Sequence, residues 1–231
     1  MLVQNIKKSI THLFFPHNCL GCSSDVLDDK ELLCAQCLNH LPYTQFLEKS
    51  NNPIDKIFYG RIPIQQAGAC FYFTKDSVIQ LLMVQLKYRG NKDAGYFLGK
   101  LLGYQLAKSA HFSNIDVIIP LPLNAVKEYK RGFNQALIIC EGIVSVWDKP
   151  ILNHIVERIV FTSTQTHENR ENRWKNMKDV FKVAQPDQLK NKHILLIDDV
   201  ITTGATLEAC AASILEIDGT LLSIATVAYT L

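Results

Sequence analysis

Four of the seven cysteines lie close together near the start of the chain, in two Cys-x2-Cys pairs, CLGC and CAQC. Each pair can bring two thiolates to one metal ion, and a tetrahedral zinc ion takes four such soft donors. Gly21 lies in the first turn, where a glycine easily adopts a positive φ. Because four ligands leave no open position, the pattern predicts a structural zinc site, whose ligands are Cys19, Cys22, Cys34 and Cys37.

A redox pair and two disulfides are the alternatives at these cysteines. His17 and His40 flank the pairs and could replace a ligand, although four cysteines suffice without them. The loop from Asp25 to Glu31 is net acidic and would repel the phosphates of DNA, so a folding role for the module is favoured over a DNA contact. The other three cysteines stand in apolar runs and are predicted to be small core residues: Cys70, Cys140 and Cys210.

The second group that could do chemistry is HILLIDDVITTGATLEAC, residues 193–210. An apolar strand stops at Asp198 and Asp199, and a small, hydroxylated loop leads into a helix. Amide N–H groups at a helix start, a glycine and threonine hydroxyls all suit a phosphate. Two carboxylates suit a pair of sugar hydroxyls, or a place near a metal-bound diphosphate. The run therefore predicts a site for a ribose 5-phosphate; a plain turn with solvated acids is the alternative.

Alternating strands and helices must position this loop. The strands are predicted at 67–73, 116–122, within 154–160, at 193–199 and at 221–230, and the helices at 77–88, 95–110, 134–147 and after Thr206. Strands separated by helices indicate a mainly parallel sheet covered on both faces, with ligands at the carboxyl ends of its strands. A short amphipathic helix is predicted before Pro16.

The totals are those of an ordinary globular protein. The chain has 231 residues, of which 48% are hydrophobic and 20% charged, which fits one domain and a smaller appendage. We place the boundary between residues 1–60 and 61–231. A net charge of +2 gives no general argument for a nucleic-acid partner, which would need a local patch. No apolar run is long enough for a secretory signal or a transmembrane segment, so we expect a cytoplasmic protein.

The segment IDDVITTGAT, residues 197–206, resembles the binding motif for phosphoribosyl diphosphate (PRPP) in type I phosphoribosyltransferases. That resemblance implies that Asp198 and Asp199 face the ribose and that Mg²⁺ accompanies PRPP. It also implies that the following loop wraps the 5-phosphate with Thr202, Thr203, Gly204, Ala205 and Thr206.

Further segments narrow the resemblance to the ComF family, the ComFC/GntX-like proteins linked to DNA uptake in competent bacteria. They include an F-P-x-x-C-x2-C start and KYRG at 87–90. They also include PLPL-x7-RGFNQA at 120–136 and a polar segment from Arg158 to Phe181. The sequence departs from the family pattern at Glu168 and at Val180-Phe181.

This resemblance implies an α/β fold like that of type I phosphoribosyltransferases, a mainly parallel sheet flanked by helices, with a small zinc-ribbon-like module. It implies a PRPP-binding phosphoribosyltransferase (a pentosyltransferase) of unknown acceptor, involved in DNA uptake and natural competence, with other competence proteins as partners. One alternative is a non-catalytic accessory protein that senses PRPP or binds single-stranded DNA. Another is a phosphoribosyltransferase of nucleotide salvage or biosynthesis.

Several basic or polar residues could contact the diphosphate or belong to a flap: Lys87, Arg89, Arg131, Gly132, Arg158, Gln165 and Arg173. Arg131 could meet the diphosphate while Gly132 allows the backbone to approach, although a solvated charged turn has the same composition. Residues 158–182 suit a mobile flap, a groove for single-stranded DNA with Trp174 and Phe161 as stacking platforms, or a solvated linker.

Overall fold

The computed structural model describes residues 18–25, 27, 31–159 and 180–230. The predicted N-terminal helix and His17 lie outside these residues. Most of the predicted flap, with Phe161, Gln165, Arg173 and Trp174, lies outside them as well.

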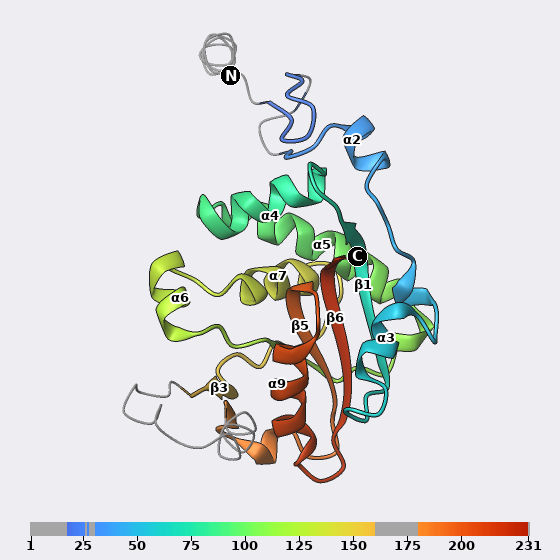
Figure 1. The fold of residues 1–231 in the computed structure, drawn as a ribbon, viewed down its shortest axis with the longest axis vertical. Coiled ribbons are helices and arrows are strands. Elements are labelled where there is room, and N and C mark those ends of the chain that lie inside the picture. The colour runs from blue at the N-terminus through green and yellow to red at the C-terminus, as the bar shows by residue number, and fades with distance from the viewer. Residues whose placement is uncertain (1–17, 26, 28–30, 160–179, 231) are drawn as a thin grey trace.

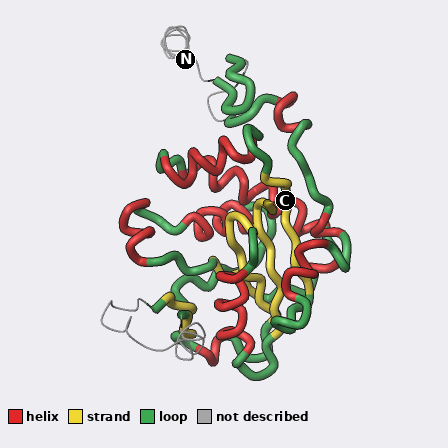
Figure 2. The backbone as a smooth tube through the Cα atoms, viewed as in Figure 1, coloured by secondary structure: helices red, strands yellow, loops and turns green. Residues whose placement is uncertain are grey.

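Four parallel strands form the central sheet, in the order β1-β6-β5-β2 (Figures 1 and 2). Their bounds are Gln66–Phe73 for β1, Val117–Pro120 for β2, His193–Ile201 for β5 and Leu221–Thr230 for β6. Pro120 pairs with Ile197, so the carboxyl end of β2 lies beside the middle of β5, one residue before Asp198. The mainly parallel sheet predicted from the sequence is confirmed.

Helices cover both faces of this sheet (Figure 1). Helices α4 (Val78–Tyr88), α5 (Lys92–Lys108) and α7 (Gln135–Val144) pack on one face, and α3 (Pro53–Phe58) and α9 (Ala205–Leu215) pack on the other. Each face of the sheet has its own hydrophobic core. Strand β5 contributes side chains to both cores, because successive side chains of a strand point to opposite faces. Leu195 and Ile197 join the α4 side, whereas Ile194 and Leu196 join the α9 side.

Close packing fixes α7 beside the end of β2. A Cβ atom on Gly99 of α5 would lie 2.1 Å from the Ile139 carbonyl oxygen, so the two helices touch through backbone there. At its N-terminus, α7 is capped by Asn134, whose side-chain amide donates to the Leu121 carbonyl at 3.0 Å. These contacts hold the α6–α7 segment against the carboxyl edge of the sheet.

The structure corrects three sequence predictions. The strand within 154–160 is β3 (Val156–Arg158), which pairs antiparallel with β4 (Phe181–Val183) outside the main sheet. The strand of residues 193–199 continues to Ile201, because its pairing with β6 continues there, and the next helix begins at Ala205. Residues 125–131, where the sequence pattern predicts no helix, form helix α6 (Ala125–Arg131), which Asn124 caps and Gly132 ends at φ 78°.

The remaining elements are short. They are α2 (Ala35–Asn39) and three 3₁₀ turns: η1 (Phe46–Glu48), η2 (Ala110–Phe112) and η4 (Pro186–Gln188). Before the predicted boundary at residue 60, the α3 residue Asp55 accepts a hydrogen bond from the Ala67 N–H of β1 at 2.7 Å. The boundary stays a prediction. In the part of the chain that the structure describes, no helix is long and apolar enough to cross a membrane.

Candidate functional site

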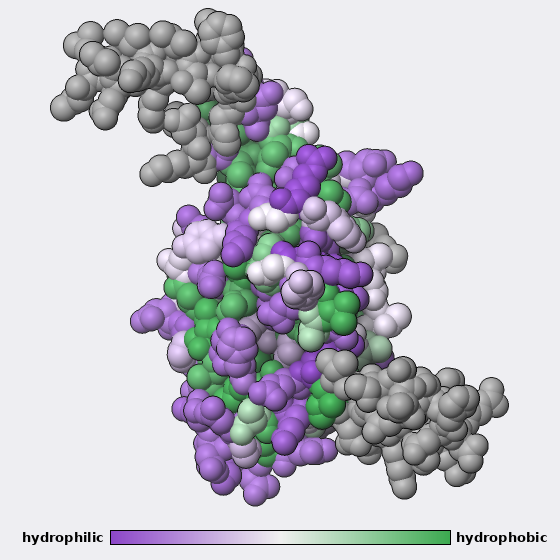
Figure 3. Space-filling view, turned by 90° about the vertical axis from the view of Figure 1, so that its left-hand side faces the viewer, coloured by the Kyte–Doolittle hydropathy of each residue, from purple (hydrophilic) through white to green (hydrophobic). Residues whose placement is uncertain are grey.

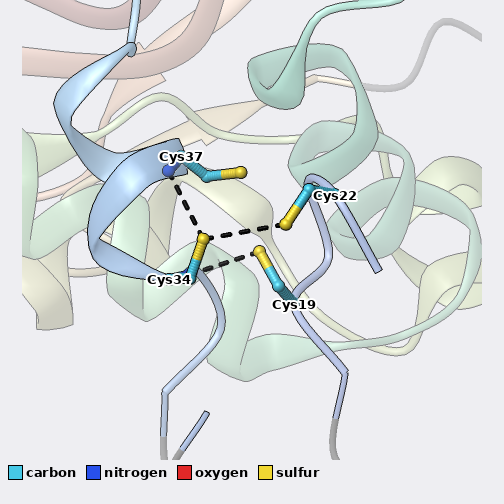
Figure 4. A group of neighbouring side chains, drawn as sticks. All are labelled: Cys19, Cys22, Cys34 and Cys37. Carbon is cyan, nitrogen blue, oxygen red and sulfur yellow. Dashed lines mark hydrogen bonds between the residues drawn. The ribbon is translucent and has the colours of Figure 1, made fainter. Parts of the chain in front are cut away.

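The four predicted cysteine ligands converge at the edge of the molecule next to α4 (Figures 1 and 4). Their sulfur atoms all lie within 4.8 Å of one another, and the Sγ atoms of Cys22 and Cys34 are 3.7 Å apart. Zinc–sulfur bonds of about 2.3 Å in a tetrahedron place neighbouring sulfurs about 3.8 Å apart. The cluster can therefore hold one tetrahedral metal ion.

Backbone N–H groups stabilise negative charge on one sulfur of this cluster. Those of Cys34 and Gly21 point at the Cys19 sulfur, at 3.3 and 3.4 Å. Burial raises the pKa of Cys19, but these N–H groups and that of Cys22 outweigh burial and lower it to about 6. Burial and the neighbouring cysteines raise the pKa of Cys37 to about 12. Four thiolates here therefore need a cation among them.

Of two residues near the cysteines, Gly21 differs from the sequence expectation and His40 agrees with it. Gly21 is not among the positive-φ residues; instead, a Cβ atom on it would lie 2.8 Å from the Cys37 sulfur, so a contact explains the glycine. His40 is exposed, and its Nδ1 atom lies 2.7 Å from the Gln36 carbonyl, outside the sulfur cluster. The three other cysteines are buried, as predicted: Cys70, Cys140 and Cys210.

The two adjacent aspartates of β5 point to opposite sides of the sheet. Asp199 turns toward α4, where its Oδ2 atom lies 2.8 Å from Nζ of Lys87. Asp198 turns toward α9 and lines a hollow of about 60 Å³ with residues 200–207. The backbone N–H of Asp199 donates to Asp198 Oδ1 at 2.8 Å, which orients the Asp198 carboxylate relative to the strand backbone. Lys87, predicted from the KYRG segment, thus lies at the site.

The loop after β5 carries hydrogen-bond donors for a ligand, and its Ala205 N–H makes only a long hydrogen bond, of 3.5 Å, to Thr203 Oγ1. Gly204 has φ 73°, and a Cβ atom on it would lie 2.8 Å from Ile57 Cγ2 of α3, so both conformation and packing require glycine. Gly204 provides no side-chain cap for α9, and the residues around it are exposed: Thr202, Thr203, Ala205 and Thr206. Uncapped N–H groups at a helix start together with hydroxyls form a site for an anion.

Arg61 holds this loop, and the sequence analysis did not single it out. Its guanidinium donates to the Thr203 carbonyl at 3.3 Å and to the Ile57 carbonyl at 3.1 Å, and it forms an ion pair with Glu208 of α9. Arg61 lies 142 positions before Thr203. No local motif marks it, because the contact exists only after β1 and β5 share a sheet.

The other predicted basic residues spread around the same edge. Arg131 donates to Gln135 Oε1 at 2.7 Å and lies over the Tyr88 ring, and its charge offsets a small part of the rise that burial causes in the pKa of Asp198. Gly132 ends α6 with a positive φ, and no atom lies within 4 Å of the place that a Cβ atom would take. The backbone conformation therefore explains the glycine, and a close approach of the backbone to a ligand is not needed to explain it. Arg89 is exposed at the end of α4.

A larger cavity, of about 280 Å³, opens beside the carboxyl end of β2. Arg158 lines it with Glu128 of α6, His154 and Glu157, and an apolar floor includes Ile119. The predicted flap residue Arg158 also lies over the Phe181 ring, with its guanidinium carbon 5.4 Å from the centroid. We call Asp198, Asp199 and the loop of residues 200–207 the aspartate site. The cavity adjoins this site, because Pro120 in its wall pairs with Ile197 of β5.

Asp198 should make the stability of the ligand-free protein depend on pH. Burial, with the Asp199 charge adding to it, raises the pKa of Asp198 to about 8, from about 3.9 in an unfolded chain. The folded state then binds more protons between pH 4 and 8, so this group lowers stability as pH rises through that window.

We expect Asp198→Asn to remove this loss. The melting temperature of Asp198→Asn should exceed that of wild type only slightly near pH 4.5. Above pH 8 the difference should be largest, roughly 4 to 8 °C, if the variant gains about 2 kcal/mol in the free energy of unfolding. Thermal melts at several pH values would measure this difference. The exposed Asp187→Asn serves as control, and an Asp198→Asn offset that stays constant with pH would contradict the assignment.

No protein-family model matches the chain. It is similar to Competence protein F of Haemophilus influenzae, with 27% identity over 209 residues that cover 84% of this chain and 89% of that protein. The DNA utilization protein YhgH of Escherichia coli O157:H7 is 28% identical over 205 residues, 86% of this chain and 84% of that protein.

A third relative, Competence protein ComFC of Bacillus subtilis, is 25% identical over 62% of this chain and 56% of its own length. Among solved structures, a hypoxanthine phosphoribosyltransferase from Staphylococcus aureus aligns over 58% of this chain and 62% of that chain, with 15% identity and a TM-score of 0.36. The sequence relatives confirm the resemblance to ComF proteins over most of the chain.

Proposed function

We propose that the protein binds PRPP with Mg²⁺ at the carboxyl ends of β5 and β2 and transfers its phosphoribosyl group to an acceptor, in a role linked to DNA uptake or use. The observation that carries the proposal is the loop after β5. It joins an uncapped helix start and exposed hydroxyls to a carboxylate within one small hollow. The names of the sequence relatives support the link to DNA.

Each part of the loop suits a different part of PRPP. The N–H groups of Ala205 and Thr206, at the start of α9, would bind the 5-phosphate, whose charge the helix dipole favours. Asp198, which lines the same hollow, would accept hydrogen bonds from the ribose hydroxyls. The charges of Lys87 and Arg131 both oppose the rise in the pKa of Asp198, so both cations lie near that carboxylate. They would bind the diphosphate, which would extend toward them from the ribose.

In the transfer, the bond from ribose C1 to the diphosphate oxygen breaks as the bond to the acceptor forms. The chain contributes by fixing the ribose between β5 and the loop and by placing cations near the leaving diphosphate. Mg²⁺, when bound, offsets part of the diphosphate charge. The 280 Å³ cavity beside β2 offers space for an acceptor close to the sheet edge.

We further propose that the ion held by the cysteine cluster is structural zinc, because four thiolates fill a tetrahedral shell and leave no position for a substrate. The cluster packs against the body of the protein, and the Cβ position of Gly21 lies 3.2 Å from Val78 Cγ2 at the start of α4. Zinc would hold this module on the helix that carries Lys87.

Titration calorimetry on the whole chain tests PRPP binding. PRPP with Mg²⁺ should bind at one site per chain, and ribose 5-phosphate alone should compete for the same site with lower affinity. No heat from PRPP, with or without Mg²⁺, would refute the proposal. Release of diphosphate on addition of nucleobases or amines would favour the transferase; binding without release would favour a PRPP sensor, the alternative that keeps the site.

Arg61→Ala tests how the loop is held. The variant should bind PRPP roughly five-fold more weakly, because a partly exposed ion pair and one backbone contact together contribute about 1 kcal/mol. Calorimetry should attribute the loss mainly to entropy, since a looser loop must be ordered on binding. Glu208→Gln is the matched control, because it keeps the Arg61 bond to the Thr203 carbonyl; an equal loss in both variants would instead indicate the ion pair.

A further inference from the structure

Two exposed tyrosines stand on neighbouring segments beside the aspartate site. Tyr129 on α6 is 90% exposed and Tyr88 at the end of α4 is 74% exposed, the highest values among the described large hydrophobic residues. Two cation–ring contacts join their segments: Arg131 lies over the Tyr88 ring at 5.9 Å, and Lys92 lies over the Phe133 ring at 5.2 Å. We call residues 87–93 and 127–131 together the tyrosine surface.

The tyrosine surface is strongly basic. Six of its residues are basic (Lys87, Arg89, Lys92, Lys127, Lys130 and Arg131) and two are acidic (Asp93 and Glu128), a net charge of 6 − 2 = +4, against +2 for the whole chain. Within the described part of the chain, no carboxylate pairs with Arg89, Lys127 or Lys130. Figure 3 looks onto the side on which α6 lies and shows hydrophilic residues over much of it.

We infer that the tyrosine surface binds single-stranded nucleic acid, with bases stacked on Tyr129 and Tyr88 and the phosphates along the unpaired cations. Rings stack on any base, and surrounding cations follow the backbone, which is how sequence-tolerant sites for single strands work. A duplex hides its base faces. An anionic membrane would favour a wedge of several large aliphatic side chains, whereas Val126 is the one exposed large aliphatic residue among residues 125–131.

This surface differs from the single-strand groove expected at 158–182, since the cations and rings counted here all lie in described residues on α4, α5 and α6 or beside them. The inference depends on the proposed function only for its link to DNA. The two proposals share Lys87 and Arg131, but the tyrosines and the cations Arg89, Lys127 and Lys130 belong to the tyrosine surface alone. Calorimetry with PRPP on variants of those residues, and anisotropy with an oligonucleotide, therefore report separately on the two proposals.

Fluorescence anisotropy with a labelled twenty-nucleotide oligothymidine, without PRPP, tests the inference. Four cations contacting phosphates predict a salt slope near −3, hence roughly 50-fold weaker binding at 200 mM than at 50 mM salt. Tyr129→Ala should weaken binding at least about five-fold, because stacking contributes about 1 to 3 kcal/mol per base. Tyr129→Phe should bind like wild type, since it keeps the ring.

Matched controls separate stacking from charge and from misfolding. Tyr104→Ala, on a 48% exposed tyrosine of α5, should leave binding unchanged, and Tyr129→Ala should keep its affinity for PRPP. Lys127→Gln with Lys130→Gln should lower the salt slope by about 1.4. Wild-type affinity in Tyr129→Ala, tighter binding to duplex than to the single strand, or binding to anionic lipid vesicles in place of the oligonucleotide would each overturn the inference.

Discussion

Replacing Asp198 and Asp199 together by asparagine should weaken the binding of PRPP by a hundred-fold or more. An asparagine keeps a carbonyl acceptor but loses the charge, which Asp198 carries above its pKa of about 8, so the comparison is made above that pH. A hydrogen bond to a charged group contributes about 1.5 to 3 kcal/mol. Two such losses add to several kcal/mol, and every 1.4 kcal/mol is ten-fold in affinity. Calorimetry with PRPP and Mg²⁺ measures the change.

The single variants should differ, because the two side chains point to opposite faces of β5. Asp198→Asn removes the carboxylate inside the hollow, whereas Asp199→Asn also releases Lys87, its partner at 2.8 Å. A double-mutant cycle with Lys87→Met separates the ion pair from the ligand contact. Asp187→Asn, an exposed change of the same kind, is the control, and PRPP binding by the double aspartate variant equal to wild type would contradict the site.

Replacing Cys34 by serine should abolish stoichiometric zinc binding and unfold the module around it. A serine hydroxyl is a poor zinc donor, and the binding free energy of a structural zinc is also folding free energy, of about 10 to 16 kcal/mol in small modules. Metal analysis of the purified chain should give one zinc in wild type and less than one in the variant. Hydrogen exchange should show lost protection at residues 31–41, while the central sheet stays protected.

Cys210→Ala is the matched control, because this cysteine is buried behind β5, far along the chain from the cluster, and should leave the zinc content unchanged. Chelator and reductant distinguish the remaining alternatives. If the module unfolds on addition of a chelator but not of a reductant, it contains a metal ion. If it unfolds with reductant alone, it contains disulfides or a redox pair. Full zinc content in Cys34→Ser would contradict the ligand set.

The sequence by itself determined features that depend on neighbours along the chain. Doubled Cys-x2-Cys pairs place four sulfurs within reach of one ion wherever the module packs, because each turn is closed locally. The run from His193 to Thr206 determined a buried strand, a short loop and a helix start in the same way, since apolar pattern and glycine placement act over a few residues. The parallel sheet followed from alternating strands and helices.

Only the tertiary structure decided what these features meet. Asp198 and Asp199 look equivalent in sequence, but the pairing of β5 through Ile201 sends them to opposite faces, one toward the loop hollow and one toward Lys87. Arg61 contacts Thr203 although 142 positions separate them, and Arg131 contacts Tyr88 although α5 and β2 lie between them in the sequence. Such partners cannot be read from spacing, because strand order and the faces that helices cover, not distance along the chain, set which side chains become neighbours.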